Sequence, residues 1–413
     1  MITNISEPII TDPTDQDVYK FSMQNFLFCQ NLLHEKVEFR FFNRGKTKFP
    51  IGFGDALRKQ VDMFSDLRFK DYMLEHMLIS MPWLNQEYVE CYLKTFRFKP
   101  ETVYIKQDGQ DLDLRCFGDY GDIIHWETQL MATMSELYNF MTDMDTNAIS
   151  MDERIIHNTE KFEAFNKINE ISNNRLRIAD YSMRRRYSKL NQKKMLSQFL
   201  DIAPNVLAGT SNLMFSRELN LKPIGTYAHE LTMYFAAIYG PLMANRITMD
   251  KWMEVYKGAL GTALPDTYTT KLFLNDFDLL HAKLYDGVRE DSAPDPIAYQ
   301  NMIIDFYKSL NIDPTTKTIM HSNGIDSLEL VEKLTLHRID NIRRAFGIGT
   351  WLANDVYKSN DIFKPVNWVI KMTSVHTKNY GIKHTVKLSD VPGKVTSIHQ
   401  PTVDLYKQLL NVE

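Results

Sequence analysis

The sequence has few of the features of disulfide-stabilised, zinc-stabilised or membrane-spanning proteins. Only three cysteines, Cys29, Cys91 and Cys116, occur in 413 residues, and no Cys-x-x-Cys pair is present. This odd, widely spaced set indicates neither a disulfide framework nor a zinc site, and it suits a reducing compartment. No uncharged apolar run approaches the ~20 residues of a membrane-spanning helix, and the first residues lack the basic and apolar regions of a secretory signal. We therefore expect a soluble, cytoplasmic protein that does not bind membranes.

An excess of positive charge is also absent. Lys and Arg total 48 against 52 Asp and Glu, which gives a formal net charge of −4. Such a balance does not provide the broad basic face of a nucleic-acid or membrane-surface binder. An anionic ligand must therefore meet a local cluster of Arg and Lys. The composition, 44% hydrophobic and 24% charged, is typical of a globular protein.

The length indicates more than one domain. Residues 1–130 mix helix and strand signals, which predicts an N-terminal α+β domain, and the aromatic-rich run 37–42 reads as a strand. Residues 131–354 are expected to form a second, larger domain. The segment 355–413 returns to strand-like runs, at 367–372 and 385–388, and is expected to pack back on the N-terminal domain or on the larger one.

A β-hairpin is predicted inside the N-terminal domain. Strand-like runs at 103–106 and 111–114 flank a turn at 108–109. A two-residue turn at this point pairs Ile105 with Leu112 and puts the apolar side chains on one face.

Short apolar runs, polar loops and helical patterns alternate through the larger domain. This rhythm predicts a parallel sheet whose loops gather at one edge, as in α/β barrels. The loops lie at 184–186, 209–212, 225–230, 264–267, 289–292, 322–326 and 346–350.

The end of the larger domain illustrates the rhythm. Apolar side chains at helical spacing predict a helix over 297–310, and a strand is expected at 318–321. Asp326 precedes Glu329 by three residues, which resembles a capping box at the start of the next helix. Another strand is expected near 342–346.

The loops contain residues that could bind phosphate. The pattern places three consecutive arginines, Arg184, Arg185 and Arg186, at the start of a helix. Taken alone they would form a solvated face. Cations at this end of a helix are, however, destabilised by the helix dipole, and a bound anionic ligand would remove that destabilisation. The Gly-Ile-Gly-Thr run at 347–350 is either a tight turn or a set of backbone N–H groups that face a phosphate.

Candidate catalytic residues lie in the same loops. His229, beside Glu230, is either a structural histidine or a nucleophile and general acid or base. Asp266 and Asp291 could cap helices, or hold Mg²⁺ or sugar hydroxyls. Together the loop residues indicate one substrate that has a phosphate, a sugar and a pyrophosphate.

Two tyrosines complete the candidate site. Tyr19 and Tyr181 could be ordinary core residues, but an aromatic pair would also hold a planar ring between its faces. A second, flat aromatic substrate is therefore expected.

The ordered set of segments resembles the nicotinate phosphoribosyltransferase family through nearly the whole chain. The resemblance implies an irregular α/β barrel of the type II phosphoribosyltransferase kind, with an N-terminal α+β domain, in a homodimer with shared active sites. It also implies an enzyme of NAD biosynthesis that joins nicotinate to 5-phosphoribosyl 1-pyrophosphate (PRPP), assisted by ATP hydrolysis. The matching segments are 17–24, 38–40, 180–188, 209–212, 225–230, 266–270, 289–292, 346–350, 369–371 and 387–394.

The resemblance also implies how nicotinate is held. Tyr181, with Tyr19 of the partner subunit, would sandwich the pyridine ring, and Arg184 would approach its carboxylate. Ser211 would lie near the same group, where related nicotinamide-using enzymes carry Asp. Ser avoids repelling a carboxylate and so favours the acid over the amide.

The remaining roles concern PRPP. Arg289 and Asp291 would contact ribose and pyrophosphate, and Asp266 would lie near the reacting centre, with Mg²⁺ spanning the pyrophosphate oxygens. His229 matches the histidine that ATP phosphorylates in the family. The 5-phosphate would be held by Gly347, Gly349, Thr350, Lys371 and Lys394.

Four positions depart from the family's pattern. Ser182 replaces Gly, Pro265 replaces Thr or Ser, the loop 291–295 is lengthened by Ala293-Pro294, and Asn323 replaces Asp. These changes leave open a phosphoribosyltransferase for nicotinamide, quinolinate or another planar base, and a non-catalytic paralogue that binds phosphoribosyl compounds.

Overall fold

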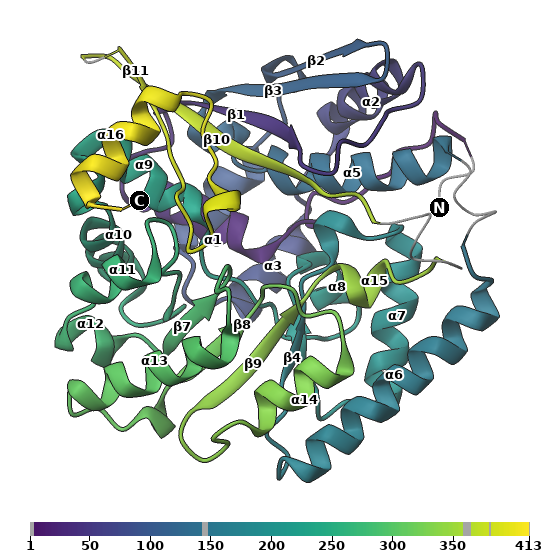
Figure 1. The fold of residues 1–413 in the computed structure, drawn as a ribbon. Helices are drawn as coiled ribbons and strands as arrows, with labels where there is room; N and C mark the ends of the chain where they lie inside the picture. Colours follow the sequence, from purple (N-terminus) through teal and green to yellow (C-terminus); the bar gives the residue numbers. More distant parts are fainter. Residues whose placement is uncertain (1–3, 143–147, 358–364, 380, 413) are drawn as a thin grey trace.

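The protein is described by a computed structural model that covers residues 4–142, 148–357, 365–379 and 381–412. It has an α/β fold with one antiparallel and one parallel sheet (Figure 1). Among the described residues, no helix combines the length and apolar character needed to cross a membrane.

The N-terminal domain combines helices with a three-stranded part of the antiparallel sheet. Its helices and strands are α1 (Val18–Cys29), β1 (Lys36–Asn43), α2 (Phe53–Asp62), α3 (Asp71–Ser80), β2 (Val103–Asp108), β3 (Asp111–Asp119), α4 (Tyr120–Ile123) and α5 (Trp126–Met141), with a π-helix at Tyr88–Leu93. The expected boundary between residues 130 and 131 falls within α5.

The C-terminal segment adds two strands to this sheet. Its elements are β10 (Trp368–Thr377), β11 (Gly381–His384) and α16 (Gln400–Leu410). The strand order is β11-β10-β1-β3-β2, so the pairing of β1 with β10 joins the two ends of the chain (Figure 1).

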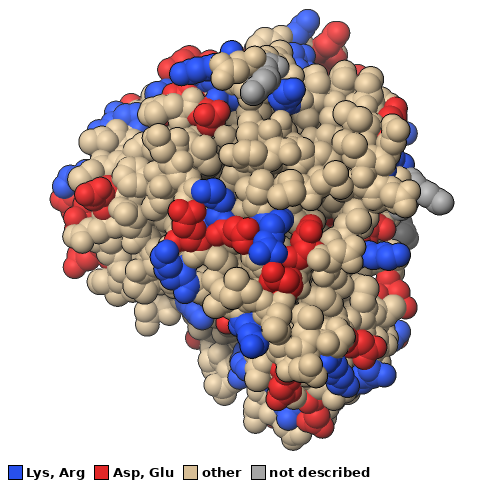
Figure 2. Space-filling view, turned by 90° about the vertical axis from the view of Figure 1, so that its left-hand side faces the viewer, with Lys and Arg blue, Asp and Glu red and all other residues tan. Residues whose placement is uncertain are grey.

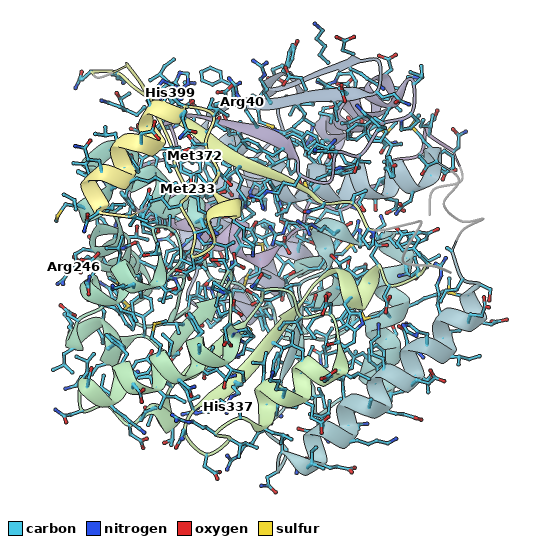
Figure 3. The ribbon with its side chains drawn as sticks, viewed as in Figure 1. Arg40, Met233, Arg246, His337, Met372 and His399 are labelled. Carbon is cyan, nitrogen blue, oxygen red and sulfur yellow. The ribbon has the colours of Figure 1, made fainter. Side chains whose placement is uncertain are left out.

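The helix α9 (His229–Tyr239) packs beside β10. Met372 of β10 and Met233 of α9 are both buried in this region (Figure 3). The expected strand at 367–372 is thus confirmed as part of β10. The expected strand at 385–388 is wrong: β11 ends before it, and the only pairing described there is an isolated bridge between Lys387 and Thr396.

The predicted hairpin is confirmed, but its register is wrong. Ile105 pairs with Leu114, because Asp108 pairs with Asp111 and the turn begins at Gly109. Gly109 has a φ of 57°, which favours glycine. Moving the turn by one residue shifts the pairing by two, so the apolar side chains still share one face.

The larger domain repeats strand, loop and helix as predicted. Its elements are α6 (Met151–Ile171), β4 (Ile178–Asp180), α7 (Lys189–Ile202), β5 (Leu207–Thr210), α8 (Leu213–Glu218), α9, α10 (Pro241–Tyr256), β6 (Thr262–Ala263), α11 (Thr270–Asp276), α12 (Leu279–Leu284), β7 (Gly287–Glu290), α13 (Pro296–Ser309), β8 (Thr318–His321), α14 (Leu328–Leu336), β9 (Arg343–Ile348) and α15 (Thr350–Ala353).

The six parallel strands form an irregular barrel sheet in the order β5-β4-β9-β8-β7-β6. β4 pairs with both β5 and β9, so the loops that follow these three strands meet at one edge. The expected helix at 297–310 and strands at 318–321 and 342–346 correspond to α13, β8 and β9. Helix α14, however, is capped by Ser327, whose hydroxyl accepts from the Leu330 N–H at 3.3 Å, and not by Asp326.

Charges of both signs are interspersed on the face that carries α10 and α12 (Figure 2). Arg246, at the edge of the molecule in Figure 3, illustrates this arrangement because it pairs with Asp250 at 3.1 Å and Asp278 at 2.7 Å. On this face, the arrangement agrees with the expectation of no broad basic surface.

Close contact between β7 and β8 makes Gly287 sensitive to substitution. A Cβ at Gly287 would overlap the carbonyl oxygen of Thr318. We expect Gly287→Ala to lower the free energy of unfolding by about 1–3 kcal/mol, because the strands must separate. Urea denaturation followed by circular dichroism measures this loss. Gly393→Ala is the control, since a Cβ there meets no atom within 4 Å; equal stability of the two variants would contradict the prediction.

Candidate active site

A cavity of about 370 Å³ opens where the parallel strands end and β10 passes. It is lined by Tyr181 after β4, Arg289 and Asp291 at the end of β7, and Lys371 of β10. Six more of the residues predicted from the sequence line this cavity: Arg184, His229, Gly347, Gly349, Thr350 and Lys394. Three predicted residues do not line it: Tyr19, Ser211 and Asp266.

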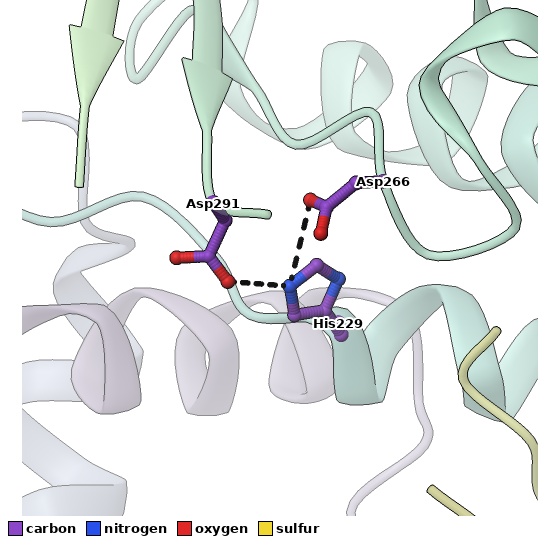
Figure 4. Close-up of side chains that lie close together, drawn as sticks. All are labelled: His229, Asp266 and Asp291. Atoms are coloured by element: carbon purple, nitrogen blue, oxygen red, sulfur yellow. Dashed lines mark hydrogen bonds and ion pairs between the residues drawn. The ribbon is translucent and has the colours of Figure 1, made fainter. Parts of the chain in front are cut away.

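His229 meets two carboxylates at the first turn of α9 (Figure 4). Its Nε2 lies 3.0 Å from Oδ2 of Asp291 and 3.7 Å from Oδ1 of Asp266. Its Nδ1 lies 3.0 Å from Oγ1 of Thr267. Since an ionised Asp291 only accepts hydrogen bonds, Nε2 carries the proton and Nδ1 accepts from the hydroxyl of Thr267.

Burial decides the charge of this histidine. Desolvation, together with the nearby ammonium of Lys387, lowers the pKa of His229 to about 4, against the opposing effect of Asp266 and Asp291. Burial opposes ionisation of Asp291 too, but Arg289, His229 and Lys387 outweigh it and hold its pKa well below the usual range. At neutral pH the site therefore contains a neutral imidazole beside an ionised carboxylate.

Asp266 is fixed by one neighbour that lines the cavity, Lys387, and by one that does not, Ser292. Its Oδ2 accepts from Oγ of Ser292 at 2.6 Å and from Nζ of Lys387 at 3.1 Å. Its Oδ1 is buried without a hydrogen-bond partner among the described residues. With His229 and Asp291 it offers ligand atoms within 4.8 Å of one another, and such carboxylate oxygens fit a hard cation such as Mg²⁺.

The three consecutive arginines have different roles. They do not lie at a helix start: Met183–Arg185 forms a 3₁₀ turn, and α7 begins later, capped by Ser188. Arg184 and Arg185 line the cavity. Arg186 is fully buried and holds Asp15 through two hydrogen bonds of 2.6 and 2.8 Å, so it is structural.

Tyr181 lies against Gly347 of β9 and against Gly349, which follows that strand. A Cβ at Gly347 would overlap the Tyr181 ring, and a Cβ at Gly349 would lie 3.1 Å from the Tyr181 carbonyl oxygen. The glycines are therefore explained first by the close approach of Tyr181. Their expected contact with phosphate stays a prediction.

Tyr19 reaches the site from within the same chain. Its ring lies 5.8 Å from the guanidinium of Arg184, and its hydroxyl lies 3.4 Å from Oε2 of Glu127. The expectation was a Tyr19 of the partner subunit. A tyrosine of the same chain thus lies beside Arg184, and the role expected for Tyr19 of the partner subunit stays a prediction.

Ser211 holds a carboxylate. Its hydroxyl donates to Oδ1 of Asp17 at 2.5 Å, and Oδ2 of Asp17 lies 3.4 Å from Nε of Arg184. Burial raises the pKa of Asp17 to about 6, although Arg184 and Ser211 oppose the shift. The preference for the acid that was attributed to Ser211 stays a prediction, and Asp17 places a protein carboxylate in the same surroundings.

The departures from the family's pattern are accommodated locally. Ser182 is buried, and its hydroxyl donates to Asp180. In the lengthened loop, the N–H of Ala293 donates to Glu290 at 2.9 Å. Asn323 accepts from Nζ of Lys394 at 2.7 Å. Pro265 is buried, and Pro294 is exposed.

Several residues that line the cavity were not named as site residues from the sequence, and the charged residues Arg44, Glu127, Arg185 and Lys387 are among them. Lys387 lies in the matching segment 387–394, and Arg185 in the arginine run, so both carried a signal. Glu127, inside α5, carried none.

Comparisons with known proteins identify the family of the chain. The family model described as nicotinate phosphoribosyltransferase (NAPRTase) family matches residues 176–413, and that of its N-terminal domain matches residues 14–135. The chain belongs to the nicotinate phosphoribosyltransferase family. The resemblance drawn from the sequence motifs is thus confirmed.

Relatives within the family match along almost their whole length. The chain is 39% identical over 386 residues to a nicotinate phosphoribosyltransferase of Desulforapulum autotrophicum, covering 92% of this chain and 94% of that protein. It is 35% identical over 396 residues to that of Chromohalobacter salexigens, covering 96% and 97%. The crystal structure of a nicotinate phosphoribosyltransferase from Porphyromonas gingivalis superposes with a TM-score of 0.90 at 30% identity, covering 98% of this chain and 100% of that one. The α/β fold is confirmed.

The environment of His229 predicts an unusual titration. We expect its ring resonances in NMR spectra to titrate near pH 4, and near 6.5 once urea unfolds the chain. Because the unfolded chain binds the proton more readily, the stability that neutral His229 contributes is present above pH 6.5 and is lost as the pH falls from 6.5 towards 4. Titration of the folded protein near 6.5 would contradict the prediction.

Proposed function

We propose that the protein joins nicotinate to PRPP, giving nicotinate mononucleotide and pyrophosphate in NAD biosynthesis. The observation that carries the proposal is the cavity: cations of three segments, Arg184, Arg289 and Lys371, line it together with the neutral His229. Family membership over both domains supports the same reaction.

Nicotinate would lie beside Tyr181, with its carboxylate near Arg184. Tyr19 does not line the cavity, so it would support the guanidinium of Arg184 and would not contact the pyridine ring itself. The pyridine nitrogen carries its own lone pair, so the reaction needs no strong base. Acceleration would come from aligning this nitrogen with C1 of the sugar and from stabilising the charges that develop.

PRPP would occupy the cationic side of the cavity. Arg289 and Asp291 would contact ribose and pyrophosphate, and Asp266, held by Lys387, would act close to the reacting centre. Mg²⁺, held by the Asp266 and Asp291 carboxylates, would neutralise pyrophosphate oxygens. The 5-phosphate would meet Gly347, Gly349, Thr350, Lys371 and Lys394.

ATP is proposed as a co-substrate that phosphorylates His229. The imidazole is neutral at physiological pH, which is the state that a nucleophile needs. We also infer a homodimer in the cytoplasm. The exposed free thiols of Cys29 and Cys91 suit a reducing compartment.

Mass spectrometry of reaction products tests the function. Purified protein is incubated with PRPP, Mg²⁺ and either nicotinate or nicotinamide, with and without ATP. We expect nicotinate mononucleotide as the main product, because Arg184 offers a cation to the carboxylate of the acid. Nicotinamide mononucleotide as the main product would overturn the choice of base. No product with either base, from protein shown to be folded, would favour another planar base, such as quinolinate, or a non-catalytic binding role.

A variant of His229 tests the role of ATP. We expect His229→Ala to keep a basal reaction and to lose its stimulation by ATP, since no imidazole is left to accept the phosphoryl group. The rate with and without ATP, and phosphate released from ATP, are the measurements. His281→Ala is the matched control, because His281 is equally buried but bonded to Asp250 and Asp278 at the surface. Unchanged ATP stimulation in His229→Ala would refute the assignment.

A further inference from the structure

A buried glutamate lies among the cations of the cavity. Glu127, near the start of α5, lines the cavity although its side chain is only 2% exposed. Its Oε1 lies 3.2 Å from Nζ of Lys371 and 3.9 Å from Nη1 of Arg184. A carboxylate at this place would repel an anionic substrate. The function of Glu127 is therefore something other than direct contact with the substrate.

The other oxygen of Glu127 is anchored from behind. Oε2 lies 2.6 Å from Nζ of Lys20, whose side chain is fully buried. Nζ of Lys20 also lies 2.7 Å from Oε2 of Glu230. Lys20 is therefore held between two carboxylates and does not line the cavity, so it fixes Glu127 and leaves Oε1 turned towards Lys371 and Arg184.

The two cations need the carboxylate that lies beside both. Lys371 and Arg184 carry like charges at one wall of the cavity, with side chains 16% and 37% exposed. Burial lowers the pKa of Lys371, and the like charges of Arg184 and Lys387 lower it further. The carboxylate of Glu127 raises it. Without the carboxylate, Lys371 would lose its proton more readily and both cations would move apart.

We propose that Glu127 is a positioning residue that holds Lys371 and Arg184 in place as the cations that bind the anionic groups of the substrates, with Lys20 anchoring it. This inference rests on the proposed function, because it assigns those cations to PRPP and nicotinate. The substrates thereby meet cations that are already oriented, and the side chains lose little further freedom on binding.

Glu127→Gln separates this role from a purely structural one. The amide keeps the shape but turns an uncharged group towards Lys371. We expect the KM for PRPP to rise about tenfold above the wild-type value under alkaline conditions, because the pKa of Lys371 is lowered further without the carboxylate, and to return towards the wild-type value as the pH falls. The turnover number should change less than KM. The PRPP affinity, measured by isothermal titration calorimetry without nicotinate or ATP, should follow the same pH dependence.

Two further variants identify the titrating group. Glu136→Gln is the matched control: Glu136 is a buried glutamate of the same helix, and its Oε2 accepts from the N–H of Lys189 at 2.9 Å, away from the cavity. It should show the wild-type pH profile. In the double variant Glu127→Gln with Lys371→Arg, the pH dependence should vanish, because Arg stays protonated.

Several results would overturn the proposal. These are a wild-type pH profile in Glu127→Gln, an equal effect in Glu136→Gln, or a pH dependence that persists in the double variant. If Glu127→Gln does not fold, Glu127→Asp replaces it, since its shorter carboxylate cannot span from Lys20 to Lys371. The same but smaller effect is then expected, and a wild-type profile would count against the proposal.

The PRPP affinities measured by calorimetry distinguish a failure of this proposal from a failure of the proposed function. If the wild type forms no nicotinate mononucleotide but binds PRPP, the function fails and the affinities still test Glu127. If the wild type does not bind PRPP, both fail.

Discussion

A buried charge is costly unless an opposite charge lies beside it, and this constraint shapes the centre of the molecule. The cavity collects cations, and two of them, Lys371 and Lys387, are matched by carboxylates from other segments. Glu127 of α5 pairs with Lys371 of β10, and Asp266 of the barrel pairs with Lys387 of the C-terminal segment. The ion pairs that prepare the site are therefore also the contacts that join the N-terminal domain, the barrel and the C-terminal segment. Loss of one partner leaves the other buried and unpaired, so we expect site and fold to be sensitive to the same substitutions.

The sequence predicted the parts of the site that follow from local pattern. Parallel strands end at one edge of a sheet, so the alternation of apolar runs and polar loops was enough to bring Arg289 and Asp291 to the edge where Tyr181 lies. His229 begins α9, which directly follows another helix in the chain and not a strand, so this argument does not place it. Ion pairs that form only through tertiary packing could not be predicted from the local sequence pattern. Lys20 and Glu127 lie within helical patterns, and periodicity indicates a buried face but not which charge meets which. Neighbouring arginines in one turn likewise have opposite roles, because backbone geometry sends one to the cavity and another to the core.

The preference for an acid over an amide depends on more than one residue. Ser211 does not leave its surroundings uncharged, since it binds the carboxylate of Asp17, which lies 3.4 Å from Arg184. The cation proposed for nicotinate is thus already shared with a protein carboxylate. With a pKa raised to about 6, Asp17 is mainly ionised at neutral pH and neutral under mildly acidic conditions. The strength with which Arg184 attracts an acid should accordingly depend on Asp17, and Ser211 would act on the choice of substrate through that carboxylate.

The charge of His229 determines what the site can accommodate during a reaction cycle. A neutral imidazole at the first turn of α9 lies at the positive end of the helix dipole, which favours an anionic group there. A phosphoryl group on His229 would bring about −2 charges close to Asp266 and Asp291. That arrangement is stable only if nearby cations or Mg²⁺ offset it, and Lys387 and Arg289 already contact these two carboxylates. Pyrophosphate bound at the same place would compete for the same cations. Phosphorylation and pyrophosphate binding should therefore oppose each other, and such opposition is what would allow ATP hydrolysis to drive pyrophosphate from the site.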